Sequence, residues 1–262
     1  LVSGLGLIGL LTSQLLRAQG CRVLGVDPNP KSCNLARQLG VEVFLLNGSD
    51  PVAWCLEHSA GVGVDAVVIT ASTSSSDPVH VAAQSCRQHG RIVLVGVTGL
   101  ELRRDLFYKK ELSFQVSCSY GPGRYDPAYE QGGQDYPIGY VRWTEQRNFM
   151  AVLQLMAQGS LQTDPLISHR FTIDQAPDAY ELLTSNTPHS GIILSYPHTS
   201  LPSQRSLTLA SRQHISPAIP IVSVIGAGNH ASRTLVPAFA RAGARFHTIA
   251  ASNMKFNIII WI

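Results

Sequence analysis

The sequence predicts an α/β fold, a doubly wound parallel sheet, over residues 1–162. Short apolar runs alternate with amphipathic stretches from Gly4 to Gly96, which is the pattern of β-α-β units on a parallel sheet. Pro and Gly fall where the helices of such units begin and end. A linker and an incomplete second β-α-β unit of the same type are expected after this domain.

The strands and helices of the first domain can be assigned in order. The expected strands are Leu1–Ser3, Arg22–Val26, Val41–Leu45, Ala66–Ile69, Arg91–Val95 and Leu112–Cys118. The expected helices between them are Leu7–Gln19, Lys31–Leu39, Pro51–Glu57 and Pro78–His89. Residues 121–147, with clustered Gly, Pro, aromatic and charged residues, predict a loop-rich insertion, and helical periodicity returns over Asn148–Gln158.

The rest of the chain divides into three parts. Residues 163–196 indicate a strand, a helix (Ala176–Leu183) and a strand, whereas residues 197–218, rich in Ser, Pro, Thr and Gln, predict a linker. In residues 219–262 a strand to Ile225, a helix over Ser232–Ala242 and a strand over Arg245–Ala250 predict a second unit. Since the chain opens on Leu1 and closes on an apolar run, we expect a piece truncated at both ends.

Composition narrows the class of protein. The chain has 262 residues, 45% hydrophobic and 14% charged, which excludes a disordered protein. A net charge of +3 without a Lys/Arg block argues against a nucleic-acid partner, and no apolar window approaches the roughly 18 residues of a membrane span. Five widely spaced cysteines favour reduced thiols in the cytoplasm. A homo-oligomer is left open.

The first turn carries a glycine motif, Gly4-Leu5-Gly6-Leu7-Ile8-Gly9, which follows a strand and opens a helix. The first glycine permits the tight turn, the second lets a pyrophosphate approach the backbone, and the third lets the helix pack on the strand. The free amides at the start of the helix favour an anion. The motif therefore predicts a dinucleotide site of the Rossmann type.

Asp27 strengthens this prediction. It stands at the end of the second strand, where a carboxylate can accept hydrogen bonds from an adenosine ribose. A carboxylate there would repel a 2′-phosphate, which favours NAD over NADP. Lys31 is a second candidate for the same ribose, although a solvated lysine at a helix start is an equal alternative.

Two more segments fall at the carboxyl edge of the predicted sheet, where the ligand crevice of such folds lies. Thr70 and Ala71 follow the fourth strand and are candidates for the adenosine half. Val95, Gly96 and Val97 follow the fifth strand and are candidates for the nicotinamide half. A loop selected only for its turn propensity explains any one of these residues equally well.

The same residues bear on two other classes of nucleotide-binding enzyme. A short-chain dehydrogenase needs a Tyr with a Lys four positions later, and none of the eight tyrosines has one. An adenosine-dependent methyltransferase uses a similar glycine turn and is kept as an alternative.

Several motifs together resemble the medium-chain zinc dehydrogenases, the superfamily of alcohol, sorbitol and threonine dehydrogenases. They are Gly4–Gly9 with Asp27, Gly90–Gly96, Tyr108–Leu112, and Pro165–Phe171 before Ala179-Tyr180. The resemblance covers about residues 1–196 and implies hydride transfer between a nicotinamide and an alcohol or sugar-like substrate. It also implies that residues 163–196 are a returning segment of the catalytic domain.

The family's zinc ligands belong to an N-terminal catalytic part that would precede Leu1. We therefore expect zinc in the parent enzyme only and no metal site in this chain. The alternative to an enzyme is an NAD-binding fragment or pseudoenzyme without turnover. His169 is expected to be a core or interface histidine, since no second metal ligand lies near it in the sequence.

A second glycine turn, with Gly226 and Gly228, follows the strand that ends at Ile225. It is similar to the start of the glucose-fructose oxidoreductase and inositol dehydrogenase family, which implies a second nucleotide-binding domain. The combination resembles the bacterial bi-domain oxidoreductases. The insertion between them carries polar and aromatic residues that line a substrate pocket or, alternatively, form a self-paired loop: Arg124, Tyr125, Asp126, Tyr129, Glu130, Arg142, Trp143, Glu145 and Arg147.

Overall fold

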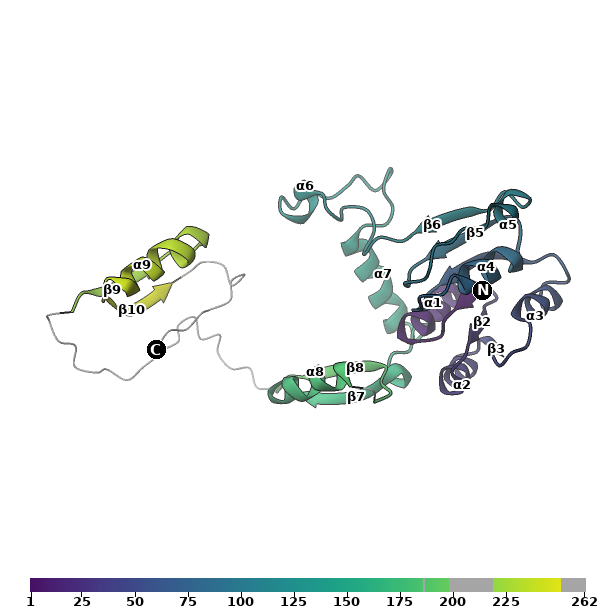
Figure 1. The fold of residues 1–262 in the computed structure, drawn as a ribbon, viewed down its shortest axis with the longest axis horizontal. Helices are drawn as coiled ribbons and strands as arrows, with labels where there is room; N and C mark the ends of the chain where they lie inside the picture. Colours follow the sequence, from purple (N-terminus) through teal and green to yellow (C-terminus); the bar gives the residue numbers. More distant parts are fainter. Residues whose placement is uncertain (186, 198–218, 251–262) are drawn as a thin grey trace. The chain divides into compact units, whose positions relative to one another are not determined.

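The computed structural model describes residues 1–185, 187–197 and 219–250 (Figure 1). The chain forms two compact units, the first ending at His198 and the second beginning at Thr199. The predicted linker, apart from Pro197, and the apolar run Ile258–Ile262 lie outside the described residues. Among the residues described, no helix is long and apolar enough to cross a membrane.

The first unit is built on a six-stranded sheet with the order β3-β2-β1-β4-β5-β6. The strands are β1 (Val2–Ser3), β2 (Leu24–Asp27), β3 (Glu42–Leu45), β4 (Val64–Ile69), β5 (Cys86–Leu94) and β6 (Ser113–Val116). All neighbouring strands are parallel. The predicted doubly wound, Rossmann-like fold is confirmed, and its strand order reverses at β1, between β2 and β4.

Helices cover both faces of this sheet (Figure 1). They are α1 (Leu7–Ala18), α2 (Pro30–Gln38), α3 (Pro51–Glu57), α4 (Asp77–Ser85) and α5 (Arg104–Tyr108). One buried apolar cluster joins the strands to α3 and α4, and a second joins them to α1 and α2. Burial of both faces explains why the strands read as nearly continuous apolar runs.

Several elements differ from the sequence prediction. Strand β5 begins at Cys86 and not at Arg91, so residues 86–89, predicted as helix, belong to the strand, and α6 (Pro127–Glu130) was not predicted. Helix α4 ends at Ser85 and not at His89, and the Lys110 ammonium group donates hydrogen bonds to the carbonyls of Ala83 (3.1 Å), Gln84 (2.7 Å) and Cys86 (2.7 Å). This cation satisfies carbonyls that a longer helix would pair with its own amides. Helix α5 was not predicted, because its five residues give too short a window for periodicity.

The remainder of the first unit contains α6 (Pro127–Glu130), α7 (Glu145–Ala157), β7 (Ile167–Thr172), α8 (Ala176–Thr184) and β8 (Gly191–Ser195). Strands β7 and β8 form a separate parallel pair. Gln14 of α1 links this part to the sheet domain, since its amide nitrogen donates to the Gln162 carbonyl (3.1 Å) and its amide oxygen accepts from the Gln162 N–H (2.8 Å). Leu166 joins the apolar cluster under α1 and α2.

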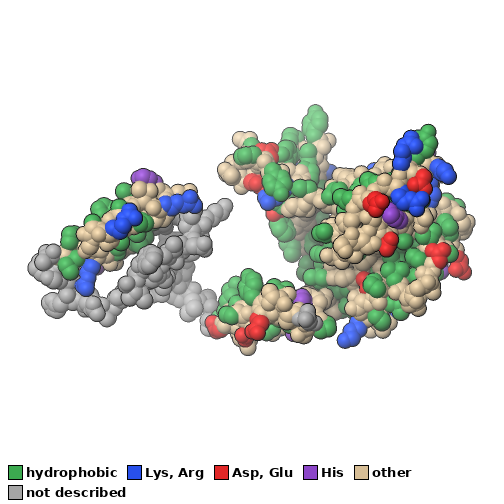
Figure 2. Space-filling model, in the orientation of Figure 1, with side chains coloured by type: hydrophobic (Ala, Val, Ile, Leu, Met, Phe, Trp, Pro, Cys, Tyr) green, Lys and Arg blue, Asp and Glu red, His purple; other side chains and the backbone are tan. Residues whose placement is uncertain are grey.

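The described part of the second unit is one β-α-β unit. It contains β9 (Ile221–Ile225), a π-helical segment (Ala231–Leu235), α9 (Val236–Arg241) and β10 (Arg245–Ala250). Strands β9 and β10 are parallel, as the sequence predicted. No Asp or Glu follows Glu181 in the chain, and Figure 2 shows Lys, Arg and His but no acidic side chain on the visible face of this unit.

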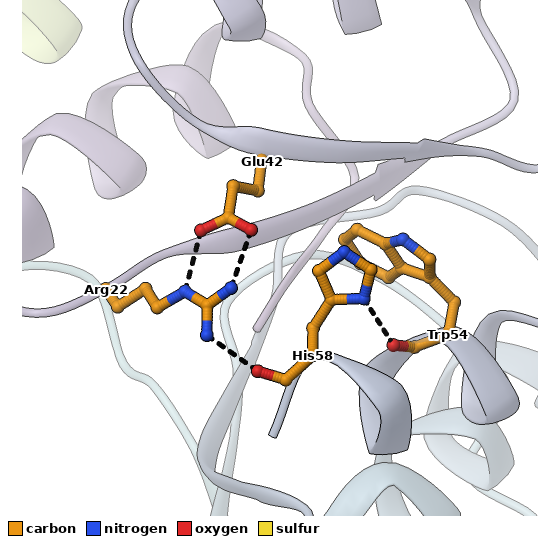
Figure 3. A network of polar contacts seen from close by, with 4 residues as sticks. All are labelled: Arg22, Glu42, Trp54 and His58. Carbon is orange, nitrogen blue, oxygen red and sulfur yellow. Dashed lines mark hydrogen bonds and ion pairs between the residues drawn. The ribbon is translucent and has the colours of Figure 1, made fainter. Parts of the chain in front are cut away.

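An exposed network of polar contacts lies at the amino edge of the sheet (Figure 3). Arg22 donates to both carboxylate oxygens of Glu42 at 2.7 Å, and also to the His58 carbonyl at 2.7 Å. The ring of His58 lies against Trp54, with 4.4 Å between centroids. The Arg22 guanidinium holds the pKa of Glu42 below its usual range. The network joins β2, β3 and the end of α3 on the side away from the glycine turn.

We predict that Glu42→Gln lowers the free energy of unfolding at pH 7 by less than about 1 kcal/mol, because the ion pair is exposed. Because the folded-state pKa is depressed, the contribution is fully present above the unfolded pKa of about 4.3 and is lost as the pH falls through the folded value. Denaturant unfolding between pH 3 and pH 7 measures this. If the free energies of unfolding of Glu42→Gln and of the unaltered chain differ by the same amount at pH 3 and at pH 7, the ion pair does not stabilise the fold.

Candidate functional site

The glycine turn after β1 is packed too closely for a side chain at two of its glycines. Gly4 has φ +97°, and a Cβ there would lie 2.6 Å from the Ala71 nitrogen. A Cβ on Gly9 would lie 1.9 Å from the Gly4 carbonyl oxygen. These two glycines therefore have the packing tasks that the sequence predicted, a tight turn and a close helix-to-strand contact.

Gly6 differs from its neighbours because it faces open space. It is exposed at the start of α1, and a Cβ there would meet no atom within 4 Å. The first amides of α1 follow it and have no partner within the helix. This is the place in the turn where an anionic ligand can approach the backbone.

The other predicted residues of the motif have different positions. Leu5 is completely buried in the apolar cluster under α1 and α2, Leu7 is half-buried, and Ile8 is 51% exposed. Leu5 packs beside Gly25, where a Cβ would lie 2.9 Å from a Leu5 methyl group. Gly25 was missed by the sequence analysis, because a glycine within a strand gives no sign of the neighbour that requires it.

Asp27 lies at the end of β2 and is 92% buried. Its Oδ2 accepts a hydrogen bond from the Leu5 N–H (2.6 Å), and its Oδ1 accepts one from the Asn29 N–H (2.7 Å). The carboxylate thus ties the glycine turn to the end of β2. A carboxylate oxygen can accept more than one hydrogen bond, so Asp27 keeps capacity for a ribose hydroxyl.

Lys31 and Cys33 lie in α2 beside this carboxylate. The Lys31 N–H donates to the Asn29 side chain, which caps the helix, and the Lys31 side chain is exposed. The Cys33 thiol is buried and donates to the Asp27 carbonyl (3.4 Å). Burial raises the pKa of the Cys33 thiol, so it stays neutral and adds no charge beneath Asp27.

Thr70 and Ala71 follow β4 and face the glycine turn. The Thr70 hydroxyl donates to the Gly4 carbonyl (2.6 Å), and the Thr70 and Ala71 amides both donate to the Ser3 carbonyl (2.8 and 3.0 Å). Thr70 therefore stabilises the turn by a hydrogen bond from the side opposite to Asp27. The sequence predicted a residue of the ligand crevice here but could not show which way its hydroxyl points.

Val95, Gly96 and Val97 follow β5 at the same edge. The Val95 and Gly96 amides donate to the Ile69 carbonyl at 2.9 Å, and a Cβ on Gly96 would lie 2.1 Å from the Ala71 carbonyl oxygen. Val95 is 42% exposed and Val97 is 71% exposed. The backbone is fixed against β4, while two apolar side chains remain accessible to a ligand.

The insertion is largely paired with itself. Glu130 accepts hydrogen bonds from Tyr120 and Arg124, and Asp126 accepts one from Tyr136. Arg147 donates to Asp135 and to the Tyr136 carbonyl, both at 2.6 Å. These contacts match the alternative of a self-paired loop for most of the charged residues named from the sequence.

The second glycine turn has a turn geometry of its own. Gly226 has φ +85°, and the Gly228 N–H donates to the Gly226 carbonyl (2.8 Å). A Cβ at either glycine would meet no atom within 4 Å. The chain has no acidic residue after this turn, so the turn has no counterpart of Asp27.

Zinc does not fit the described residues. Within them, no group of three His, Cys, Asp or Glu side chains could hold a metal ion. His169 is half-buried, lies 2.9 Å from the Ser168 hydroxyl through Nδ1, and stacks on Phe171 with 6.3 Å between ring centroids.

The fold and the glycine turn define a nucleotide-binding domain of the Rossmann type. Residues 8–131 match the family model described as zinc-binding dehydrogenase. This part of the chain is therefore similar to the cofactor-binding domain of the zinc-type alcohol dehydrogenases, in agreement with the resemblance seen in the sequence motifs.

Similar proteins are dehydrogenases. The chain is 27% identical over 200 residues to D-guloside 3-dehydrogenase of Escherichia coli (strain K12), which covers 73% of this chain and 52% of that protein. It is 31% identical over 106 residues to an alcohol dehydrogenase of Geobacillus stearothermophilus, covering 40% and 31%. The crystal structure of 2R,3R-butanediol dehydrogenase from Bacillus subtilis superposes with a TM-score of 0.57 at 24% identity, covering 73% and 49%. The chain spans about half the length of the first of these relatives.

Gly6 and Gly9 allow the fold to be separated from ligand binding. We predict that Gly6→Ala changes the free energy of unfolding by less than about 1 kcal/mol but abolishes dinucleotide binding, because the added methyl group occupies the open approach to the backbone. Gly9→Ala should destabilise the fold by about 1–3 kcal/mol or more, since its Cβ collides with backbone. Denaturant unfolding and calorimetric titration with NAD measure both effects. Unchanged NAD affinity in Gly6→Ala contradicts the placement of the phosphates.

Proposed function

We propose that this chain is the cofactor-binding part of an NAD-dependent oxidoreductase that transfers hydride between the nicotinamide and an alcohol or sugar-like substrate. The observation that carries the proposal is the combination of an open Gly6 with a buried carboxylate, Asp27, at the switch point of the sheet. The similarity to dehydrogenases supports the reaction class.

In this proposal each part of the edge has one task. Asp27 accepts hydrogen bonds from the adenosine ribose, and the amides at the start of α1 bind the pyrophosphate over Gly6. Val95, Gly96 and Val97 lie behind the nicotinamide half, with the apolar side chains of the two valines keeping water from it. When bound, NAD supplies the hydride acceptor, and the residues of this chain bind and orient it.

The carboxylate of Asp27 also supports NAD over NADP. A 2′-phosphate would place two like charges next to a buried carboxylate that already accepts two backbone hydrogen bonds. Lys31 could offset part of this repulsion, because it lies in the first turn of α2 with an exposed side chain. The NADP affinity of Lys31→Gln, compared with that of the unaltered chain, measures the contribution of Lys31.

The domain organisation that we propose has four parts. Residues 1–162 form the NAD-binding domain, residues 163–196 a returning segment of a catalytic domain, residues 197–218 a linker, and residues 219–262 the start of a second nucleotide-binding domain. The division of the chain into two compact units and the β-α-β order of 221–250 support this. The arrangement is that of a bi-domain oxidoreductase in the cytoplasm, to which Gly226 and Gly228 contribute the second turn.

Two alternatives predict different binding. An NAD-binding fragment without turnover binds NAD but reduces none of it with any alcohol or polyol in the presence of zinc. An adenosine-dependent methyltransferase binds its methyl donor more tightly than NAD. The relatives at the family level are dehydrogenases, which favours the oxidoreductase.

We predict that Asp27→Ala weakens NAD binding by about 1.5–3 kcal/mol for each charge-assisted hydrogen bond lost to the ribose. Asp27→Asn retains an acceptor oxygen but not the charge, so it should weaken NAD binding less and raise the relative affinity for NADP. Calorimetric titration of both nucleotides against the three proteins measures this. If both variants bind NAD as the parent chain does, Asp27 is not part of the site.

A further inference from the structure

Three arginines lie in the insertion, and they differ in how their charge is balanced. Arg124 forms an ion pair with Glu130, and Arg147 forms one with Asp135 at 2.6 Å. Arg142 has no carboxylate within ion-pair distance among the residues described, and its guanidinium carbon lies 4.1 Å from the ring centroid of Trp143. Arg142 and Trp143 are both exposed, Trp143 by 48%. The insertion therefore presents one unbalanced cation on an accessible aromatic ring.

A series of hydrogen bonds ties this pair to the carboxyl edge of the sheet. The Ser117 N–H, directly after β6, donates to the carbonyl of Leu94, the last residue of β5. Three residues further on, the Tyr120 carbonyl accepts a hydrogen bond from Asn148 in the first turn of α7 (3.2 Å). Figure 1 shows the insertion and the start of α7 beyond the end of β6. Arg142 and Trp143 directly precede that turn, so a short hydrogen-bonded path connects them with the carboxyl ends of β5 and β6.

The backbone on both sides of the pair is fixed. Thr144, the next residue, is completely buried at the start of α7. Arg147, one turn into the helix, donates to the carbonyl of Val141, the residue before Arg142. Because both neighbours are held, the loop that carries the Arg142 and Trp143 side chains has little backbone freedom to lose when a ligand binds.

The chemistry of the pair selects a class of ligand. A guanidinium offers a planar set of N–H donors that fits a carboxylate with two parallel hydrogen bonds, and stacking on an aromatic ring leaves these donors accessible at the edge. An aromatic face attracts the positively polarised C–H groups of a polyol chain. A neutral alcohol would contact the ring of Trp143 but would not neutralise the charge of Arg142.

We propose that Arg142 and Trp143 form a substrate subsite for a polyol or sugar that carries a carboxylate, that is, a sugar acid. This inference rests on the proposed function, since it places the sugar acid beside the nicotinamide half of the NAD site. It deepens that function by naming the substrate class.

The test uses the chain saturated with NAD and two probes that differ mainly at one end, D-gluconate and D-sorbitol. We expect D-gluconate to change the fluorescence of Trp143 and to bind at least about tenfold more tightly than D-sorbitol. Arg142→Gln should remove this preference, and Trp143→Phe should remove the fluorescence change. The affinity for NAD should stay the same in both variants.

A matched control is available in α5, where Arg104 lies 4.1 Å over the ring of Tyr108. Figure 1 shows α5 beside the start of β6, at the other end of that strand from the insertion. Arg104→Gln should leave the binding of both probes unchanged. If D-gluconate does not bind, or binds Arg142→Gln as it binds the parent chain, the inference is wrong. If the unaltered chain does not bind NAD, the proposed function is wrong as well. The two failures can therefore be told apart.

Discussion

The glycine turn after β1 is held from two sides, and the rest of the first unit depends on that contact. On one side the Asp27 carboxylate accepts the Leu5 N–H, and on the other the Thr70 hydroxyl donates to the Gly4 carbonyl. Between them the backbone is so close that Gly4 and Gly9 have no room for a Cβ. The turn is therefore fixed by contacts within the chain, so the binding proposed for it would require little further ordering.

This constraint divides the edge into residues that build the turn and residues that remain open to solvent. Thr70, Gly9 and Gly96 touch neighbouring backbone, and their role is packing. Gly6 and the side chains of Val95 and Val97 remain open. In the proposed function Asp27 has both roles, because a carboxylate that fixes the turn can still accept a ribose hydroxyl. The ion pair of Arg22 and Glu42 lies at the opposite edge of the sheet.

The fold was predictable from sequence because its signals are local. Apolar runs bounded by Gly and Pro gave all six strands of the sheet to within a few residues, and Pro51–Glu57 and Arg245–Ala250 were predicted with the bounds that the structure has. The error at α4 came from a contact between distant residues, whereas α5 was missed because it is too short to show periodicity. Helix α4 stops early where Lys110 binds its last carbonyls, and nothing near residue 85 in the sequence records that contact.

The candidate site was predictable in its residues but not in their orientation. The glycine spacing and the position of Asp27 identified the turn, since each of these residue types has a specific backbone or hydrogen-bonding task. That Thr70 points into the turn, that Gly25 makes room for Leu5, and that Arg142 alone among the arginines of the insertion has no carboxylate partner all depend on tertiary contacts.

The most direct test of the central claim is amide chemical-shift mapping of the isotope-labelled chain during titration with NAD. The account predicts that the largest shifts occur at Leu5, Gly6 and Asn29, whose amides lie in the turn or donate to Asp27, with smaller changes at Val95 and Gly96. Amides at the amino edge, such as those of Arg22 and His58, should not shift. Shifts confined to the amino edge, or no shifts at saturating NAD, would contradict the account.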